Sequence, residues 1–476
     1  MQTVSSWTGF NISVRDDTDV TADVVRYLPT INVPATQLST VQEVLIQSEK
    51  IRSSLSLQSI AIVFDQALYA KATEIIWKHN EKFANIVPRL GTFHTICNLL
   101  GVIGKRFQDS GLKDLCIESG VIAAGSVSGV LDGKKYNRAV RLHKLLYEAL
   151  LRLAWKGFLV TKGSNAETEI TDLIGEFSSN VCQMTFTETL ENPSFVSLAD
   201  EFSLHLDQLR SGAGKLAVFW MSYVDLVDVM LNFLRSSREG IWAMHLKAVQ
   251  DMIPWVFAYD NTNYARYLSH YYAEMSHLKT EHPEAHGFLQ HGGFSVQLGP
   301  RNPFGRIPVD QTIEETVNKD TQTPGGTKGF SLKPGAVSRY YLTAEYRSSF
   351  LHMLRDVTGT RNFTSNTGHP DLSKSRIKKD EKDVLSLIDM LQNNWINPFS
   401  TETSDLVSIS TGMAAPENIT KDLLEAKVKG EKASKEFRED RIECEPAKTK
   451  FFAPIKKQKL KTFSDMIVKK KYQVAG

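Results

Sequence analysis

Residues 59–79 read SIAIVFDQALYAKATEIIWKH, and residues 85–107 read NIVPRLGTFHTICNLLGVIGKRF. Each stretch begins with a short apolar run typical of a buried strand and continues with the apolar spacing of a helix. Asp65 follows the first apolar run, whereas Gly91 and His94 follow the second. Two such units side by side would bring Asp65 and His94 to one edge of a sheet. In open α/β sheets that edge is where ligands and catalytic carboxylates collect.

Asp65 and His94 each have two interpretations. A carboxylate at a strand end suits a metal-dependent phosphoryl-transfer site, because Mg²⁺ prefers oxygen ligands and two-metal catalysis needs several carboxylates. Asp65 can equally cap the helix that follows it, and the two roles are compatible. His94 can donate to a phosphate or a carboxylate, or it can simply be a satisfied histidine at the start of a helix. The residues alone leave these choices open.

The composition predicts a soluble, intracellular protein. The chain has 476 residues, of which 42% are hydrophobic, and this is enough for substantial cores. It contains no run of 18 apolar residues and starts without a basic segment followed by an apolar one, so we expect neither a membrane span nor a signal peptide. Its four cysteines lack CxxC spacing, which favours reduced, mostly buried thiols over a zinc ribbon or a disulfide framework.

Positive charge is concentrated at the C-terminal end. Residues 446–476 contain nine lysines and one acidic residue, Asp465. The net charge of the whole chain is +2, so residues 1–445 carry −6. Basic tails are typical of nucleic-acid contacts or nuclear import, although a merely solubilising, disordered end is the alternative.

The pattern along the chain predicts five segments. They are a poorly ordered N-terminal segment (1–40), an α/β core (41–160), a helical region (161–290), a loop-rich and then helical region (291–400), and a polar, lysine-rich, largely disordered tail (401–476).

Within these segments we expect several particular features. The stretch LAVFWMSYVDLVDVMLNFLRSSREG predicts a core helix and not a membrane helix, because Asp225 and Asp228 interrupt it. We also expect helices at 40–53, 114–156, 340–357 and 382–393, a polar break at 161–169 and a helix break near Pro254.

Several residues are candidates for contacts with nucleic acid. The helical stretch YNRAVRLHKLLYEALLRLAW has a basic side, and AYDNTNYARYLSHYYAEM is dense in tyrosine, asparagine and arginine. The alternative is that these aromatic residues form a core face with their hydroxyls at its rim. The candidates are Arg138, Arg141, Lys144, Tyr264, Arg266, Lys456, Lys457, Lys459 and Lys461.

The string of motifs SWTGFN, VFDQALYAKA, RLGTFHT, IGKRF, GSVSGVL, YNRAVRLHKLLYEAL, AYDNTNYARY, DQTIEETVNKD and GGTKGF resembles a family of uncharacterised metazoan proteins that is abundant in cnidarians. Its members are often associated with mobile elements. The resemblance covers most of the chain and implies a transposon-derived origin. It also implies that longer members extend upstream of this chain.

The layout VFDQ…RLGTFHT is also similar to that of eukaryotic transposases with an RNase H-like core. This resemblance implies that Asp65 is the second catalytic carboxylate, that His94 is the histidine at the next helix start, and that Glu274 is the last carboxylate after a helical insertion. Asp65 and Glu274 would then hold Mg²⁺ or Mn²⁺. Residues 1–58 offer no strand that ends in the first catalytic Asp, and a two-metal site without it should be nearly inactive.

We therefore expect a mixed α/β, predominantly helical protein with a partial RNase H-like sheet core, a large helical insertion and a basic disordered tail. The expected function is that of a transposon-derived, non-catalytic protein associated with DNA in the nucleus and not with a membrane. One alternative is an active Mg²⁺- or Mn²⁺-dependent strand-transfer or nicking enzyme when full length, with Asp65, His94 and Glu274 as catalytic residues. The other is a helical scaffold that binds proteins. The oligomeric state is left open.

Overall fold

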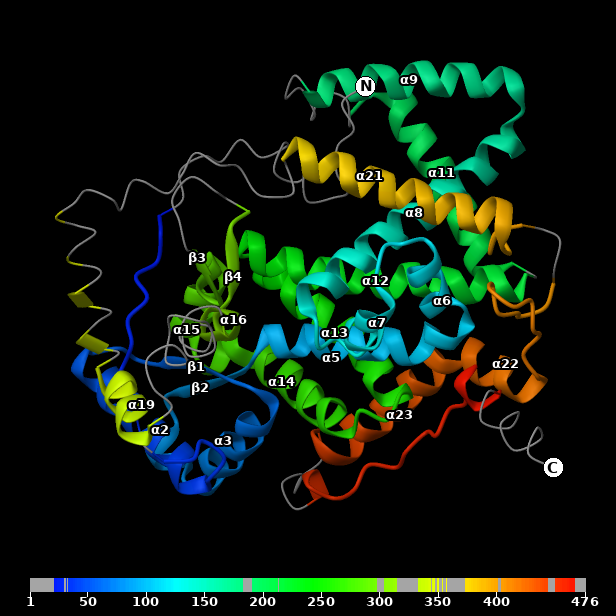
Figure 1. Ribbon diagram of the computed structural model, residues 1–476. Helices are drawn as coiled ribbons and strands as arrows, with labels where there is room; N and C mark the ends of the chain where they lie inside the picture. The colour runs from blue at the N-terminus through cyan, green and yellow to red at the C-terminus, as the bar shows by residue number, and fades with distance from the viewer. Residues whose placement is uncertain are drawn as a thin grey trace.

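The structure is a computed structural model, and its ribbon is drawn in Figure 1. It describes residues 21–29, 31, 33–182, 191–212, 214–297, 304–314, 333–343, 345–346, 349–350, 353, 357, 373–400, 404–443 and 450–466. The Asp16, Asp17 and Asp19 cluster and the GGTKGF motif lie outside these residues.

The two predicted strand–helix units are confirmed. Their strands pair in parallel, with Ile60 opposite Ile86 and Phe64 opposite Leu90. The second strand is buried along its whole length, which explains why its residues other than Arg89 are apolar without alternation. The elements of this region are α2 (Leu38–Ser54), β1 (Ile60–Phe64), α3 (Gln66–Lys78), α4 (Asn80–Phe83), β2 (Ile86–Leu90) and α5 (Thr92–Phe107).

Helices cover this two-stranded sheet. The predicted helix at 40–53 is confirmed as α2, which contacts α3 and both strands, and α14 (Thr262–Glu281) contacts α3 and β2. β1 and β2 therefore lie at one side of a much larger helical body (Figure 1). The helices of that body that follow α5 are α6 (Leu112–Glu118), α7 (Ala124–Leu131), α8 (Tyr136–Lys162), α9 (Ser164–Cys182), α11 (Pro193–Ser211), α12 (Lys215–Glu239) and α13 (Trp242–Ala258).

The predicted core helix is α12, which ends at Gly240 in a left-handed conformation. It is the one helix in the described residues that is long and apolar enough to cross a membrane. Most of its apolar residues are buried against α5, α8 and α13. This packing is that of a core helix in a globular protein.

Of two predicted breaks, one is confirmed and one is wrong. The break at 161–169 is confirmed at Gly163, which separates α8 from α9 with a φ of 80°, although the rest of this stretch is helical. Pro254 lies inside α13, and the helix continues through it. Ile253 and Trp255 beside it are buried, so tertiary packing holds the helix although a proline removes one hydrogen bond.

A small antiparallel sheet follows α14 within the region that the sequence predicts to be rich in loops. Val296 lies opposite Ile307, and Asp23 from the N-terminal region borders the sheet: its backbone N–H donates to the carbonyl of Gln297, and its Oδ2 accepts the backbone N–H of Gln297. The elements here are α15 (Pro283–Phe288), the π-helix η2 (Leu289–Gly293), β3 (Ser295–Gln297), β4 (Arg306–Pro308) and α16 (Val309–Ile313).

The later helices begin before their predicted positions. α19 (Pro334–Leu342) starts ahead of the predicted helix 340–357, whose described residues are helical except Thr343, and α21 (Lys374–Asp389) with the π-helix η6 (Met390–Asn394) contains the predicted helix 382–393. α21 packs along α8, as Figure 1 shows.

The prediction of a disordered tail is wrong for residues 404–443 and 450–466. α22 (Glu417–Leu424) and α23 (Ala426–Arg441) are regular helices, and α23 packs tightly on α13. Residues 450–466, here named the C-terminal strap, run along the helical body (Figure 1) with Phe451 and Phe463 buried. The lysine content favours disorder, but Phe451 and Phe463 attach this segment to the helical body.

The fold class is therefore mixed α/β and predominantly helical, as predicted. In the described residues the strands form two separate sheets of two strands each.

Candidate functional site

The carboxyl ends of β1 and β2 bring Asp65 and His94 to the same edge, as the sequence predicts. The backbone N–H of Gly91, just after β2, donates to the carbonyl of Phe64 at the end of β1 over 2.7 Å. Asp65 is the N-cap of α3, where its Oδ1 accepts the backbone N–H of Leu68 at 2.8 Å. The helix-capping interpretation of Asp65 is thus confirmed.

Asp310 is the group that organises this edge. It lies on α16, and its side chain is only 8% exposed. Its Oδ1 accepts the backbone N–H of Phe93 at 3.1 Å, and its Oδ2 accepts the backbone N–H of His94 at 3.1 Å and lies 3.0 Å from His94 Nδ1. One carboxylate therefore caps the first turn of α5 and also orients the imidazole. The partial positive charge at the start of α5 favours a carboxylate in this place.

This contact sets the electrostatics of His94. The hydrogen bond to Asp310 raises the pKa of His94, and partial burial of the ring opposes this effect. The negative charges of Asp310, Asp65 and Glu314 raise the pKa further. The His94 side chain remains 36% exposed. With Nδ1 turned to Asp310, the protonated ring can present its Nε2–H to an anion or to a leaving group.

Gly91 permits the close approach of these parts. A Cβ at this position would lie 2.5 Å from Oδ2 of Asp310 and 3.1 Å from the carbonyl oxygen of Phe64. Any larger residue would push α16 away from the strand ends. The glycine in RLGTFH therefore has a packing reason.

Two further side chains border the edge. The hydroxyl of Tyr264 donates to the backbone carbonyl of His94 at 3.1 Å, and burial raises its pKa. Burial also raises the pKa of the Cys97 thiol to about 12, so it stays neutral and is a poor nucleophile. Tyr264 thus serves to hold α14 against the start of α5.

The donor set does not fit a resident two-metal centre. Three N–H groups use most of the acceptor capacity of Asp310, and Leu68 uses part of that of Asp65. Within the described residues, no group of three or more His, Cys, Asp or Glu side chains is arranged to hold a metal ion. Through His94, this edge has a group that can transfer a proton or donate to an anion.

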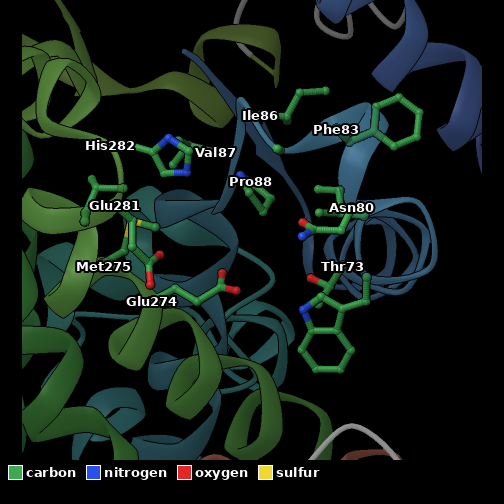
Figure 2. Close-up of a pocket in the computed structure, with 14 residues that line it drawn as sticks. Thr73, Asn80, Phe83, Ile86, Val87, Pro88, Glu274, Met275, Glu281 and His282 are labelled. Carbon is green, nitrogen blue, oxygen red and sulfur yellow. The ribbon is translucent and has the colours of Figure 1, made fainter. Parts of the chain in front are cut away.

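Glu274 is not brought to this edge. It lies ten residues after Tyr264 on α14, which corresponds to about 15 Å along the helix axis. Its Oε1 lies 3.1 Å from His270 Nε2, and its side chain faces a separate pocket beside Asn80 and Thr73 (Figure 2). Among the described residues, Asp310 and not Glu274 is the carboxylate that contacts His94.

The candidates for nucleic-acid contact fall into two groups. Most of those on α8 and α14 are engaged inside the protein: Arg141 pairs with Asp380 and Asp383, Lys144 is half-buried, and Arg266 donates to the carbonyl of Ala453. Arg138 is exposed and donates to Ser126 at the surface. Tyr264 is engaged with His94 as described. The other group consists of Lys456, Lys457, Lys459 and Lys461, which are all exposed on the C-terminal strap.

Asp310 is the residue that the sequence reasoning missed as a site candidate. A local signal for it exists, because Asp310 and Gln311 follow the apolar run at 307–309 as Asp65 and Gln66 follow the apolar run of β1. Both places read as an apolar run followed by Asp-Gln, although β4 ends at Pro308 and Asp310 is the second residue of α16.

Comparison with known proteins identifies a family but no function. No curated protein and no solved structure matches the chain. The sequence model of one family matches residues 6–475. The chain therefore belongs to the family described as Domain of unknown function (DUF8702).

Proposed function

We propose that this chain is a nucleic-acid-associated protein of transposon-derived origin that acts in the nucleus and contacts the DNA backbone through the C-terminal strap. The observation that carries the proposal is the row of four exposed lysines on a segment whose backbone is fixed. Oδ1 and Oδ2 of Asp260 accept the backbone N–H groups of Gln458 and Lys459 at 2.6 and 2.9 Å, and Asp422 accepts that of Lys461 at 3.0 Å.

The charge of the strap supports a polyanionic partner. Lys456, Lys457 and Lys459 form no ion pair with any residue in the part of the chain that the structure describes. The rest of the chain up to residue 445 carries a net charge of −6, so the lysines do not belong to a generally basic surface. A fixed row of cations loses little conformational freedom when it binds phosphates, and binding releases the counterions of DNA.

A charge-removal variant tests this proposal. Changing Lys456, Lys457, Lys459 and Lys461 together to glutamine should weaken binding to duplex DNA. The slope of log Kd against log salt should fall by about 3 to 4, since each phosphate contact contributes about 0.9. Fluorescence anisotropy with a labelled duplex at several salt concentrations measures this slope.

The matched control makes the same change in charge on the neighbouring helices. It converts Lys421, Lys427, Lys432 and Lys435 of α22 and α23, which are also exposed, to glutamine. This control variant should keep most of the wild-type slope of log Kd against log salt. If both variants bind alike, or if the wild-type protein shows no salt-dependent affinity, the strap is not a DNA-binding surface and the scaffold function is favoured.

The second candidate is a phosphodiester-cleaving enzyme that uses the edge of β1 and β2. The observation that favours it is the buried Asp310 carboxylate that orients His94 beside Asp65. In this reading, His94 donates its Nε2 proton to a phosphate oxygen or to a leaving group, and Asp310 keeps the ring oriented. Under this second proposal, the β1–β2 pair derives from an RNase H-like sheet.

A plasmid-nicking assay of the wild-type chain separates the two candidates. An enzyme should convert supercoiled plasmid to the open circle, and His94→Gln should remove this activity. Asp207→Asn, an exposed carboxylate on α11, should leave it unchanged. Parallel assays with Mg²⁺, Mn²⁺ and chelator show whether an added metal matters. If the plasmid stays intact under all conditions, the enzyme candidate is eliminated and the DNA-binding function remains.

A further inference from the structure

A second site lies at the other end of β2. A cavity of about 230 Å³ opens between α3, α4, the first residues of β2 and the C-terminal half of α14 (Figure 2). Its lining includes Pro88 of β2, and Gly91 at the strand-end edge lies three residues further on, which is about 10 Å along a strand. The two sites therefore share a strand but not a surface.

The polar part of the cavity is acidic. Glu274 and Glu281 line it from α14, and Asn80 adds its amide. Neither lysine nor arginine is among the described residues that line it, and the nitrogen groups beside the two carboxylates are the imidazoles of His282, which lines the cavity, and His270, which pairs with Glu274. The contacts that Glu274 makes inside the protein include His270, and its side chain is 33% exposed. A ligand with a positive charge would gain most from this arrangement.

The remaining walls are apolar. Trp77 and Ile76 of α3, Phe83 of α4, and Met275 and Leu278 of α14 form them. An indole face beside two carboxylates is suited to an organic cation, because the ring attracts the charge and the apolar walls accept an alkyl stem. A hydrated metal ion would make no use of these walls.

Thr73 supplies an independent indication of a ligand. Its side chain lines the cavity and is only 1% exposed, and its hydroxyl oxygen makes no hydrogen bond of regular geometry. The Tyr69 hydroxyl lies close enough to Thr73 to interact with it, but it bonds to Nδ1 of His270 at 3.2 Å. Figure 2 shows Thr73 and Glu274 on opposite walls of the same space. A donor placed between them would satisfy both oxygens.

We propose that this cavity binds a guanidinium or alkylammonium group carried on an apolar stem. The cation lies between the Glu274 carboxylate and the Thr73 hydroxyl, and its stem packs against Trp77. The cavity is of a size for one side chain or a small amine and not for a nucleotide.

Calorimetric titration of the full chain with butylguanidinium tests the proposal. We expect a Kd in roughly the millimolar range, which is common for a ligand with so few atoms. The neutral isostere butylurea should bind at least about tenfold more weakly, because it has the same shape without the charge. Glu274→Gln and Thr73→Val should each weaken butylguanidinium binding by about tenfold.

Glu74→Gln is the matched control, since Glu74 lies on α3 beside Thr73 but pairs with Lys78 outside the cavity. It should leave the affinity unchanged. Equal binding of butylguanidinium and butylurea, or equal affinity of Glu274→Gln and Glu74→Gln, would overturn the proposal. If thermal unfolding shows that Thr73→Val does not fold, Thr73→Ser replaces it in the test. This variant keeps the hydroxyl and should retain the binding of butylguanidinium.

A second titration distinguishes the two possible sources of such a cation, a protein side chain and a free metabolite. N-acetylarginine amide presents the side chain as a protein partner would, whereas butylguanidinium represents a free metabolite. Tighter binding of the peptide form assigns the cavity to a protein side chain. Tighter binding of the free cation assigns it to a small amine. Failure of both ligands to bind would contradict the proposal without affecting the function proposed for the strap.

Discussion

Replacing Asp310 by alanine should lower the free energy of unfolding by about 2–4 kcal/mol. Three N–H groups would lose their charged acceptor, and a hydrogen bond to a charged group contributes about 1.5–3 kcal/mol before allowance for the partial exposure of His94. The first turn of α5 would also lose its cap, because the backbone N–H groups of Phe93 and His94 both donate to this carboxylate. Urea denaturation at pH 6, followed by circular dichroism, measures the change.

Asp65→Ala is the matched control for this prediction. Asp65 is also a helix-capping carboxylate after a parallel strand, but it accepts the backbone N–H of Leu68 and does not hold a histidine. Its replacement should cost only about 1 kcal/mol. Equal losses in the two variants would show that Asp310 acts as an ordinary helix cap and does not organise the edge.

The isosteric change Asp310→Asn should move the titration of His94. The hydrogen bond and charge of Asp310 raise the pKa of His94 in the folded chain, so the variant should titrate at a lower pH. A group whose pKa is raised on folding stabilises the protein fully below its unfolded pKa, which is about 6.5 for histidine. That contribution is lost as the pH rises through the folded value.

The destabilisation caused by Asp310→Asn should therefore be larger at pH 5.5 than at pH 8.5. NMR titration of the histidine ring protons, assigned with His94→Gln, measures the pKa directly. An unchanged pKa in Asp310→Asn would contradict the assignment of Asp310 as the partner of His94.

The sequence predicts the positions of Asp65 and His94 because these two residues lie in neighbouring strand–helix units of the chain. Asp65 and His94 follow strands whose apolar runs and succeeding helices can be read within 50 residues, and parallel pairing then places their ends together. Asp310 reaches the same edge from 216 residues beyond His94, after a long helical region. No periodicity in a short window encodes such a contact. Only the repeated pattern of an apolar run followed by Asp-Gln gives a sign of it.

The difference between local pattern and long-range packing also explains why the predictions for Arg141 and Glu274 fail. The basic side of the helix around Arg141 is a correct reading of local periodicity, but that surface is not solvated. α21 packs on it and supplies Asp380 and Asp383 as partners. The resemblance to transposases assigns Glu274 a role by its position after a helical insertion, whereas its surroundings depend on where α14 crosses α3. Exposed and covered charged faces have the same sequence pattern, so tertiary packing alone decides between them.

Replacing Phe451 by alanine should release the C-terminal strap. Phe451 is 1% exposed, and its ring centroid lies 5.0 Å from that of Trp77, 5.3 Å from His270 and 5.8 Å from Tyr267. Removing a buried phenylalanine side chain costs about 3–5 kcal/mol. Because the strap is joined to the body by few anchors, this loss should appear as local opening before global unfolding.

Hydrogen exchange measures this opening at the amides of Gln458 and Lys459, which donate to Asp260. A loss of about 3 kcal/mol or more corresponds to exchange that is more than about a hundredfold faster.

Phe452 provides the control, since it is the next residue on the same strap and is 41% exposed. Phe452→Ala should leave the exchange of these two amides nearly unchanged, although Phe452 also contacts Trp77. If Phe451→Ala leaves their exchange slow, the carboxylates of Asp260 and Asp422 hold the strap without the aromatic anchor. If it speeds exchange and also lowers DNA affinity while all four lysines remain, the fixed backbone of the strap, and not its charge alone, determines how strongly the protein binds DNA.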